Sequence, residues 1–336
     1  MTPYSIIIVT WLGDELLGDC LKSLKKVYGG RMPEIVVVDN GNTPLTTKVI
    51  CDEYSTVKYV AAKENLGFAG GNNLGLKYCT NEYVVLLNND TELTGDSIAP
   101  LVEYLDLHHQ CAAAQGTIVL ASNPEKQDGT GMWWTPLGIL APEGFLTPTK
   151  EGPKEPREVF SIGGAFFITR QSAIKKVGGL FYDHFKSYYE EVNLCHRFYL
   201  AGYKCAYVPT IPVLHRHSVT AGKFGWHKIQ KQYYRNIFFS TLTCFNWWNR
   251  LRFGGTIALF CLAQAAVSLV KGNTVYLKAH SANLVQLFKE RELIRETRKE
   301  VNGFRVLSDR ELLKIAIKHQ PWSYYFKLFF GWAKTA

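Results

Sequence analysis

The chain has 336 residues, 47% of them hydrophobic and 20% charged, so it can bury a large core and is not a disordered chain. Its net charge of +9 is uneven: residues 1–216 carry 19 Lys/Arg and 23 Asp/Glu (−4), whereas residues 217–336 carry 19 and 6 (+13). The eight cysteines form no CxxC pair, which argues against a zinc site or a disulfide framework and favours reduced cysteines in a cytosolic protein.

Strand patterns alternate with helix patterns along the first hundred residues. Runs rich in β-branched residues, such as SIIIVTW and EIVVVD, are typical of strands buried on both faces, and apolar positions three and four residues apart predict helices between them. The alternation predicts an α/β fold with a mostly parallel sheet flanked by helices. The predicted strands are 5–11, 34–39, 57–61 and 82–87, and the predicted helices are 14–27, 46–54, 72–79 and 96–109.

The middle of the chain has weaker patterns. Residues 121–156 are rich in Gly, Pro and Thr, and we expect a long loop there, close to the functional site. Residues 159–169 predict one strand that bends at a Gly-Gly pair. A helix over 189–201 is expected to stop at Gly202, with short extended pieces over 206–208 and 213–215.

Strand patterns end near residue 220, which predicts an α/β domain over 1–220 and a helical, basic and aromatic region over 221–336. Residues 253–270 carry no charge and border on the length of a membrane span, but their Gly, Gln and Ser/Thr residues favour a buried or interfacial helix. Residues 322–332 are dense in aromatic side chains with lysines nearby, which suits a bilayer interface or an aromatic helix docked on the first domain.

Polar or glycine-rich residues follow all four strands predicted in the first hundred residues. Because the carboxyl ends of parallel strands share one edge of a sheet, where ligands bind, we expect one nucleotide-sized site there. No GxGxxG follows the first strand and no GxxxxGK[ST] occurs, which argues against a dinucleotide or P-loop site. The residues at the strand ends are Thr10-Trp11, Asp39-Asn40, NLGFAGGNN (65–73) and Asn88-Asn89-Asp90.

Three sets of residues are candidates for metal binding or catalysis, and each set also has a simpler structural explanation. Asp90 ends a strand and suits a hard metal ion that bridges phosphates, or it caps the next helix. Glu190 and Glu191 open a helix whose dipole is expected to keep them ionised and able to act as a general base; ordinary charge at a helix start is the alternative. His215 follows a short strand and suits a softer divalent ion or a simple hydrogen bond.

Taken together, the motifs resemble glycosyltransferase family 2 of the GT-A fold, and within it the rhamnosyltransferase-type enzymes of bacterial surface polysaccharide synthesis. The resemblance implies an inverting enzyme that uses Mg²⁺ or Mn²⁺ and moves a sugar from a dTDP- or UDP-sugar to a hydroxyl of a lipid-linked saccharide. Rhamnose is the first choice of sugar, with galactose, galactofuranose and glucose as alternatives. The matching motifs over residues 5–218 are SIIIVTW, IVVVDNG, NLGFAGGNN, VVLLNND, GGAFFITR, YYEEVNLCHR and VLHRHS.

The resemblance also implies roles for single residues. Glu191 matches the catalytic base, Glu190 matches a partner that contacts the acceptor, and Asp90 and His215 match the residues that hold the metal. Contacts with the acceptor are expected from Gly164 and, unless they only pack the loop, from Trp133 and Trp134. The residues expected to bind the nucleotide sugar are Thr10, Trp11, Asp39, Asn40, Asn65, Gly67, Asn72, Asn88, Asn89 and Asp90.

The sequence departs from the family pattern at three places. Glu191 replaces the commoner Asp and Asn193 replaces a usual Asp, so Glu190 and Glu191 share the assignment of the base. The NND sequence lacks the first Asp of the DXD motif, which implies a less charged metal site. The rivals are a nucleotidyltransferase, which usually has a basic glycine-rich loop after its first strand, a nucleic-acid-binding protein that uses the basic tail, and an inactive sugar-binding scaffold.

The basic last third predicts where the protein works. It contains no recognisable nucleic-acid-binding module, so we expect an anionic membrane surface as its partner and no nucleic acid. A lipid-linked acceptor points to the same surface. We therefore expect a cytoplasmic protein, peripheral on the inner face of the cell membrane, with a homo-oligomer as an open alternative to a monomer.

Overall fold

The computed structural model describes residues 2–12, 14–41, 44–216 and 226–325. The chain divides into two compact units, one of residues 1–132 and 142–219 and one of residues 133–141 and 220–336. The second unit thus includes nine residues that the sequence places within the first domain. The motif residues His217 and Ser218, and the aromatic tail from residue 326 onward, lie outside the described residues.

An eight-stranded sheet forms the centre of the first unit, in the order β11-β13-β6-β12-β4-β1-β2-β3. Strand β1 is parallel to β2 and β4, β2 is parallel to β3, and β12 runs antiparallel between β4 and β6. The predicted mostly parallel α/β sheet is confirmed. Its strands are β1 (Tyr4–Thr10), β2 (Glu34–Asp39), β3 (Val57–Ala61), β4 (Tyr83–Leu87), β6 (Cys111–Gln115), β11 (Arg157–Val159), β12 (Phe166–Arg170) and β13 (Lys204–Tyr207).

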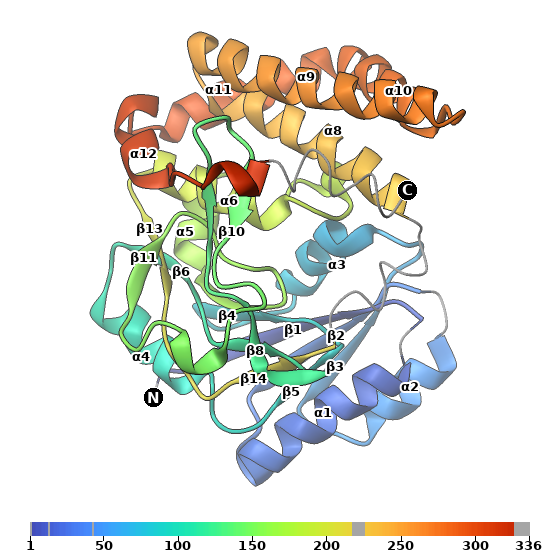
Figure 1. The fold of residues 1–336 in the computed structure, drawn as a ribbon. Coiled ribbons are helices and arrows are strands. Elements are labelled where there is room, and N and C mark those ends of the chain that lie inside the picture. The colour runs from blue at the N-terminus through green and yellow to red at the C-terminus, as the bar shows by residue number, and fades with distance from the viewer. Residues whose placement is uncertain (1, 13, 42–43, 217–225, 326–336) are drawn as a thin grey trace. The chain divides into compact units, whose positions relative to one another are not determined.

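Helices cover both faces of this sheet because alternate side chains of each strand point to opposite faces (Figure 1). Ile6 and Ile8 of β1 belong to a core shared with α1, α2 and α4, whereas Val9 packs with Leu74 of α3 on the other face. Each such fully buried side chain stabilises the fold by about 1.5–3 kcal/mol. The helices are α1 (Asp14–Tyr28), α2 (Pro44–Asp52), α3 (Gly67–Leu76), α4 (Ala99–Leu107), α5 (Gln171–Lys176) and α6 (Glu190–Leu200).

Helix α3 begins at Gly67, five residues before the start predicted for the helix over 72–79. Glycine is a poor helix former, by about 1 kcal/mol per residue relative to alanine. Here it lets the helix lie close to the sheet: a Cβ on Gly71 would be 2.7 Å from Val9 Cγ1, and a Cβ on Gly75 would be 2.6 Å from Ile7 Cγ2. Packing against β1 therefore overrides the local preference.

A second sheet has the order β5-β14-β7-β8, and its strand β8 lies in the long loop expected over 121–156. The prediction was wrong because β8 starts with exposed polar residues and lacks the alternation of apolar side chains that marks a half-buried strand. Strands β9 and β10 also lie in that region and pair with each other. These strands are β5 (Thr91–Leu93), β7 (Ile118–Leu120), β8 (Asn123–Gly129), β9 (Met132–Trp134), β10 (Leu140–Pro142) and β14 (Val213–His215).

The single strand predicted over 159–169 is two strands in different parts of the large sheet. Strand β11 pairs at the edge with β13, whereas β12 lies between β4 and β6. Gly163 and Gly164 lie in the connection, and Gly163 N–H donates to Gln115 Oε1 at 2.7 Å. The glycine pair therefore breaks the strand instead of bending it.

The second unit is helical, as predicted, and its first four described helices lie side by side (Figure 1). Helix α9 is long and apolar enough to cross a membrane by length and composition, and about a third of its most apolar stretch is buried. Trp134, from the 133–141 segment, is 2% exposed and packs against Phe245 and Phe253. The helices are α8 (Trp226–Cys244), α9 (Trp247–Val270), α10 (Val275–Lys289), α11 (Arg291–Phe304) and α12 (Asp309–Ala316).

Candidate active site

The carboxyl ends of β1, β2 and β4 are joined by hydrogen bonds. Asn89, just after β4, donates from its side-chain amide to Thr10 Oγ1 at 3.0 Å. The N–H of Asn40, just after β2, donates to Thr10 O at 2.8 Å. Asp39 is buried at the end of β2, where its carboxylate accepts from Gly41 N–H and from Tyr59 O–H, each at 3.0 Å. These predicted nucleotide-binding residues thus gather at one edge of the sheet.

The start of α3 is tied to this edge by two asparagines. Asn40 accepts from Leu66 N–H at 2.8 Å and donates to Gly67 O at 2.9 Å, while Asn65 accepts from Gly67 N–H at 2.8 Å. Gly67 has a φ of +76°, and a Cβ there would lie 2.5 Å from Lys186 O. Glycine is required for both reasons.

We predict that Gly67→Ala destabilises the protein by about 1–3 kcal/mol, because the new methyl group meets backbone atoms that cannot turn aside. Chemical unfolding measures the loss. Gly30→Ala is the matched control, since a Cβ there has no neighbour within 4 Å and the backbone has no positive φ. Equal stability of the two variants would contradict the tight packing of Gly67 against Lys186.

The second sheet brings together two carboxylates and an imidazole. Strand β14 ends at His215, which is paired with Thr91 of β5, the residue after Asp90. His215 Nδ1 lies 2.5 Å from Asp128 Oδ2, and His215 Nε2 lies 3.3 Å from Asp90 Oδ1. Burial lowers the pKa of His215, but the hydrogen bond with Asp128 and the nearby Asp90 raise it to about 9.

Asp90 and His215 fit the divalent metal that the resemblance implies. Asp90 Oδ1 is buried and accepts no hydrogen bond from the described residues, so apart from its ion pair with His215 Nε2 it can serve as an oxygen ligand beside the imidazole. Asp128 holds the other ring nitrogen, as carboxylates commonly do behind a metal-bound histidine. Within the described ranges no group of three or more His, Cys, Asp or Glu side chains could hold a metal ion by itself.

Glu190 and Glu191 begin α6 as predicted, but the expectation that the helix dipole keeps them ionised was wrong. Burial raises the pKa of Glu191 to about 7, and burial together with the charge of Glu191 raises the pKa of Glu190 well above its usual value. Desolvation therefore outweighs the helix dipole. Glu190 is 5% exposed, and its Oε2 has no hydrogen-bond partner among the described residues.

Glu191 is the more accessible of the two carboxylates. Its side chain is only partly buried and lies against Gly164, where a Cβ would be 3.7 Å from the Glu191 carboxyl carbon. Ala165, the next residue, accepts from Asn88 N–H at 2.9 Å. The end of β4, which leads to Asp90, is thus connected through Asn88, Ala165 and Gly164 to Glu191.

The family model for Glycosyl transferase family 2 matches residues 5–178, just over half of the chain. The chain belongs to glycosyl transferase family 2. The matched residues include the carboxyl ends of β1, β2 and β4 and the Gly163-Gly164 connection, while Glu191 and His215 follow the matched segment.

Three relatives are similar to the chain at low identity. Low-salt glycan biosynthesis hexosyltransferase Agl10 of Haloferax volcanii is 25% identical over 66% of this chain and 69% of its own length. Rhamnosyltransferase WbbL of Escherichia coli is 26% identical over 58% and 78%. The N-acetylglucosaminyl-diphospho-decaprenol L-rhamnosyltransferase of Mycobacterium tuberculosis is 23% identical over 76% and 90%.

Solved glycosyltransferase structures share the fold. GalNAc-T7, solved with UDP, GalNAc and Mn²⁺, matches 72% of this chain and 48% of its own with a TM-score of 0.58 and 17% identity. The mannosyltransferase PcManGT from Pyrobaculum calidifontis, solved with GDP-Man and Mn²⁺, matches 90% and 86% with a TM-score of 0.52 and 16% identity. At these identities the likeness concerns the fold alone, and the predicted GT-A fold of this family 2 member is confirmed.

The remaining predicted site residues lie in different places. Trp11 is half-buried directly after β1. Asn72 is buried one turn into α3, and its amide donates to Phe68 O at 2.9 Å. Trp134 is a core residue of the second unit, whereas Trp133 is half-buried, with Lys318 Nζ 5.4 Å from its ring centre.

Sequence reasoning missed two features of the site. Asp128 was overlooked because it lies in an expected loop, 87 residues before His215, and only the pairing of β7 with β8 and β14 brings the two together. The segment before α6 was also overlooked, although Lys186, Tyr188 and Tyr189 all have positive φ, which is rare for residues other than glycine. Such strain often marks functional loops, and Lys186 O accepts from Ala69 N–H at 2.8 Å.

We predict that Glu191→Gln stabilises this family 2 member above pH 7. Between about pH 4.5 and 7 the folded protein holds a proton that the unfolded chain has released, so its stability falls as the pH rises through this window. Gln cannot ionise and avoids this loss, which is about 1.4 kcal/mol for each unit of pKa shift. Urea unfolding of the wild type and of Glu191→Gln at pH 4.5 and pH 8 measures this difference in stability.

The stability difference between the variant and the wild type should be larger at pH 8 than at pH 4.5. Glu103→Gln, on the exposed side of α4, is the control and should not show this increase. A difference for Glu191→Gln that stays constant between the two pH values would contradict the raised pKa.

Proposed function

We propose that the protein is an inverting glycosyltransferase that moves rhamnose, or another hexose, from a dTDP- or UDP-sugar to a hydroxyl of a lipid-linked saccharide. The observation that carries the proposal is the short run of contacts from Asp90, through Asn88 and Ala165, to Gly164 against Glu191. It places a candidate base next to the edge of the sheet that carries the predicted nucleotide-binding residues.

Glu191 is the proposed base. A carboxylate with a pKa of about 7 is half ionised at neutral pH and takes up a proton more readily than an ordinary glutamate. It accepts the proton of the acceptor hydroxyl while that oxygen forms a bond to the anomeric carbon. The bond from the anomeric carbon to the diphosphate breaks, and its electron pair leaves with the diphosphate. One displacement inverts the configuration of the sugar.

The donor binds at the strand ends in this proposal. Asp39 hydrogen-bonds the base, Thr10 and Asn65 lie along the nucleotide, and Asn88 contacts the ribose or the sugar. Asp90 and His215 hold the divalent metal, Mg²⁺ or Mn²⁺, which when bound offsets the negative charge that develops on the leaving diphosphate. Asp128 keeps the His215 ring in place.

The relatives support the choice of sugar and acceptor. Two of the three named members are rhamnosyltransferases, and the name of the mycobacterial one describes a sugar attached through diphosphate to decaprenol. The titles of the two structural relatives name nucleotide ligands and Mn²⁺ in those proteins. These names make rhamnose, a diphospholipid acceptor and a divalent metal the first choices to test.

The proposal also places the protein on the inner face of the cell membrane. The support is the charge of +13 over residues 217–336 and the aromatic residues in the same region. A lipid-linked acceptor would be presented at that surface. Flotation with vesicles tests the placement, and a protein that stays in solution with anionic vesicles would overturn it.

The experiment that tests the function is a thermal-shift screen of nucleoside diphosphates, with and without Mn²⁺ or Mg²⁺. We expect dTDP or UDP to raise the melting temperature by several degrees only when the metal is present, because binding to the folded state alone stabilises it. The preferred base then narrows the donor. A folded sample that responds to no diphosphate would overturn the proposal and favour a scaffold or a nucleic-acid-binding protein.

A further inference from the structure

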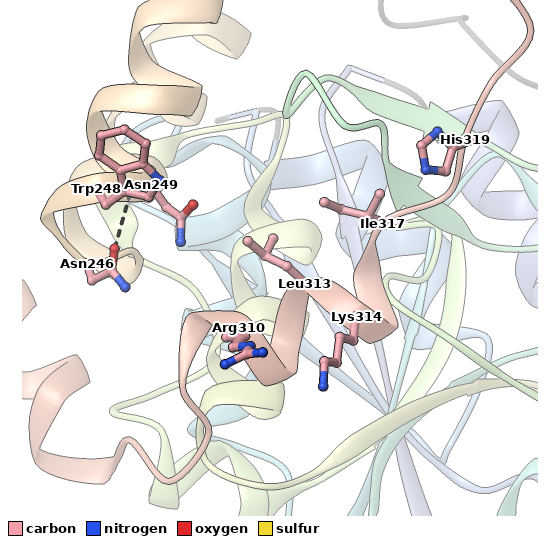
Figure 2. A pocket seen from close by; sticks show the side chains of 8 residues that line it. All are labelled: Asn246, Trp248, Asn249, Arg310, Leu313, Lys314, Ile317 and His319. Atoms are coloured by element: carbon pink, nitrogen blue, oxygen red, sulfur yellow. Dashed lines mark hydrogen bonds between the residues drawn. The ribbon is translucent and has the colours of Figure 1, made fainter.

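A cavity of about 580 Å³ opens in the second unit between the start of α9 and helix α12 (Figure 2). Its wall is basic, with Arg310 and Lys314 from α12 and His319 just after that helix. All three side chains are exposed, and within residues 226–325 neither Arg310 nor Lys314 forms an ion pair. Their positive charges are therefore available to a ligand.

Two acids, Asp309 and Glu311, adjoin Arg310 in the sequence. Glu311 accepts from Ser308 N–H and O–H and interacts electrostatically with Lys314, whereas Asp309 is neutralised. Asp309 is 2% exposed and accepts from Arg305 Nη1 at 2.8 Å. Its other oxygen accepts from Asn246 N–H at 2.8 Å and from the side-chain amide of Asn249 at 2.9 Å. Asp309 thus fixes the start of α9 at the cavity, and the positive end of this 24-residue helix adds to the attraction for an anion.

The basic wall is also fixed just beyond the end of α12. Ile317, which lines the cavity, forms a β-bridge with Trp134, and Lys318 N–H donates to Trp134 O at 2.8 Å. Trp134 is itself anchored, because its ring packs at centroid distances of 5.1 Å on Phe245 and 6.5 Å on Phe253. The residues that surround the basic groups are therefore held by the core of the unit.

An exposed apolar strip leads away from the cavity along α9. Trp248 lines the cavity and is 60% exposed, and apolar residues on the same side of the helix follow it at steps of three or four positions, except for one step of eight across Gly255. No charged residue occurs from Phe253 to Val270. The strip is roughly 30 Å long, at 1.5 Å per residue. We call it the α9 strip, and its members are Trp248, Leu251, Leu259, Leu262, Ala266 and Leu269.

We propose that this surface binds an anionic phospholipid of a bilayer, with the phosphate headgroup in the cavity and the acyl region against the α9 strip. The charges favour this occupant over a second copy of the chain, which would bring the same basic groups to the cavity. The cavity is also large enough for a headgroup and combines apolar and basic lining, as small-molecule sites do. The inference rests on the proposed membrane attachment and names the residues that recognise the lipid.

The test is the binding of the full-length protein to phosphatidylcholine vesicles with and without phosphatidylglycerol. We expect binding to require the anionic lipid. Arg310→Ala/Lys314→Ala should bind about 30-fold more weakly, from the usual contribution of two basic side chains near an anionic surface. The matched control is Lys289→Ala/Lys299→Ala, which removes the same charge from exposed positions outside the cavity and should weaken binding less than about threefold.

A second variant tests the strip. Leu259→Gln/Leu262→Gln changes two side chains that are 68% and 64% exposed, so the fold should be kept, and it should abolish the vesicle binding that the wild type retains at high salt. An equal loss in the two basic double variants would show general charge attraction and overturn the proposal. Inorganic pyrophosphate is a soluble probe of the same cavity. The proposal would also be overturned if the protein bound pyrophosphate tightly through Arg310 and Lys314 but bound vesicles equally well without these two residues.

The vesicle-binding measurements use neither the donor sugar nor the acceptor. Loss of the predicted lipid binding would therefore not contradict the proposed sugar transfer. A protein that binds the lipid but transfers no sugar would contradict only the proposed transfer reaction. The melting temperature of each variant is the check on folding.

Discussion

Replacing Glu191 by Gln should lower the rate of sugar transfer by about 10³-fold while leaving the binding of dTDP or UDP unchanged. A general base contributes roughly 10²–10⁴-fold to such reactions, and Gln keeps the shape of the side chain but cannot take up the proton. The Glu191 side chain is partly exposed beside Gly164, so a hydroxyl can approach it. Transfer is measured with a radiolabelled donor, and nucleotide binding is measured by calorimetry in the same buffer.

Glu190→Gln is the control that separates the two carboxylates. Glu190 is buried, and its charge is disfavoured first by burial and then by Glu191, so we expect it to keep its proton and its replacement by Gln to lower transfer far less. The pH profile should change little, because burial, and not Glu190, raises the pKa of Glu191. If Glu190→Gln lost transfer and Glu191→Gln kept it, the roles of base and partner would be reversed.

Strands β1, β2 and β4 were predictable because they are almost fully buried and consist mainly of apolar residues, and the edge strand β3 was predictable from its Val and Tyr residues although it is partly exposed. Strands β2 and β3 were predicted to the residue, and β1 and β4 to within a residue at either end. The end of α6 was predictable from Gly202, which has a φ of +87° just beyond the helix. In these places local preference and tertiary packing agree, so the sequence alone suffices.

The second sheet was missed where tertiary pairing overrides the local pattern. Gln127 of β8 is buried and pairs with Val119 of β7, although the residues before it are exposed and polar. The same strand pairing brings Asp128 into contact with His215, and no spacing of residues in the sequence predicts this contact. Contacts between residues so far apart in the chain cannot be predicted from local sequence motifs unless the pattern of a known family includes both residues.

The pKa values of the two glutamates were mispredicted for a related reason. The helix dipole is a local feature that the sequence displays, whereas burial depends on what the fold packs around the carboxylates. The dipole stabilises an exposed charge by about 0.3–1 kcal/mol, and loss of water around a buried carboxylate costs more than that. The sequence therefore pointed to two carboxylates at the start of α6 but not to the burial that raises their pKa values.

Replacing Asp90 by Asn should abolish the metal-dependent rise in melting temperature that a nucleoside diphosphate produces in the wild type. Asp90 Oδ1 is the buried oxygen without a hydrogen bond, so it is the atom that the proposed metal would use, and an amide is a much weaker ligand than a carboxylate. Binding of the free metal and of the diphosphate with metal are both measured, which gives a readout that does not depend on transfer.

Asp128→Asn should weaken metal binding about 10–100-fold without abolishing it, because Asp128 acts on the metal only through the orientation of the His215 ring. Asp52→Asn, at an exposed position of α2, is the matched control and should bind metal as the wild type does. The order of metal affinity among Asp52→Asn, Asp128→Asn and Asp90→Asn, from highest to lowest, is what tests these roles. If Asp128→Asn lost more affinity than Asp90→Asn, Asp128 would itself be a ligand and the metal would lie between His215 and Asp128.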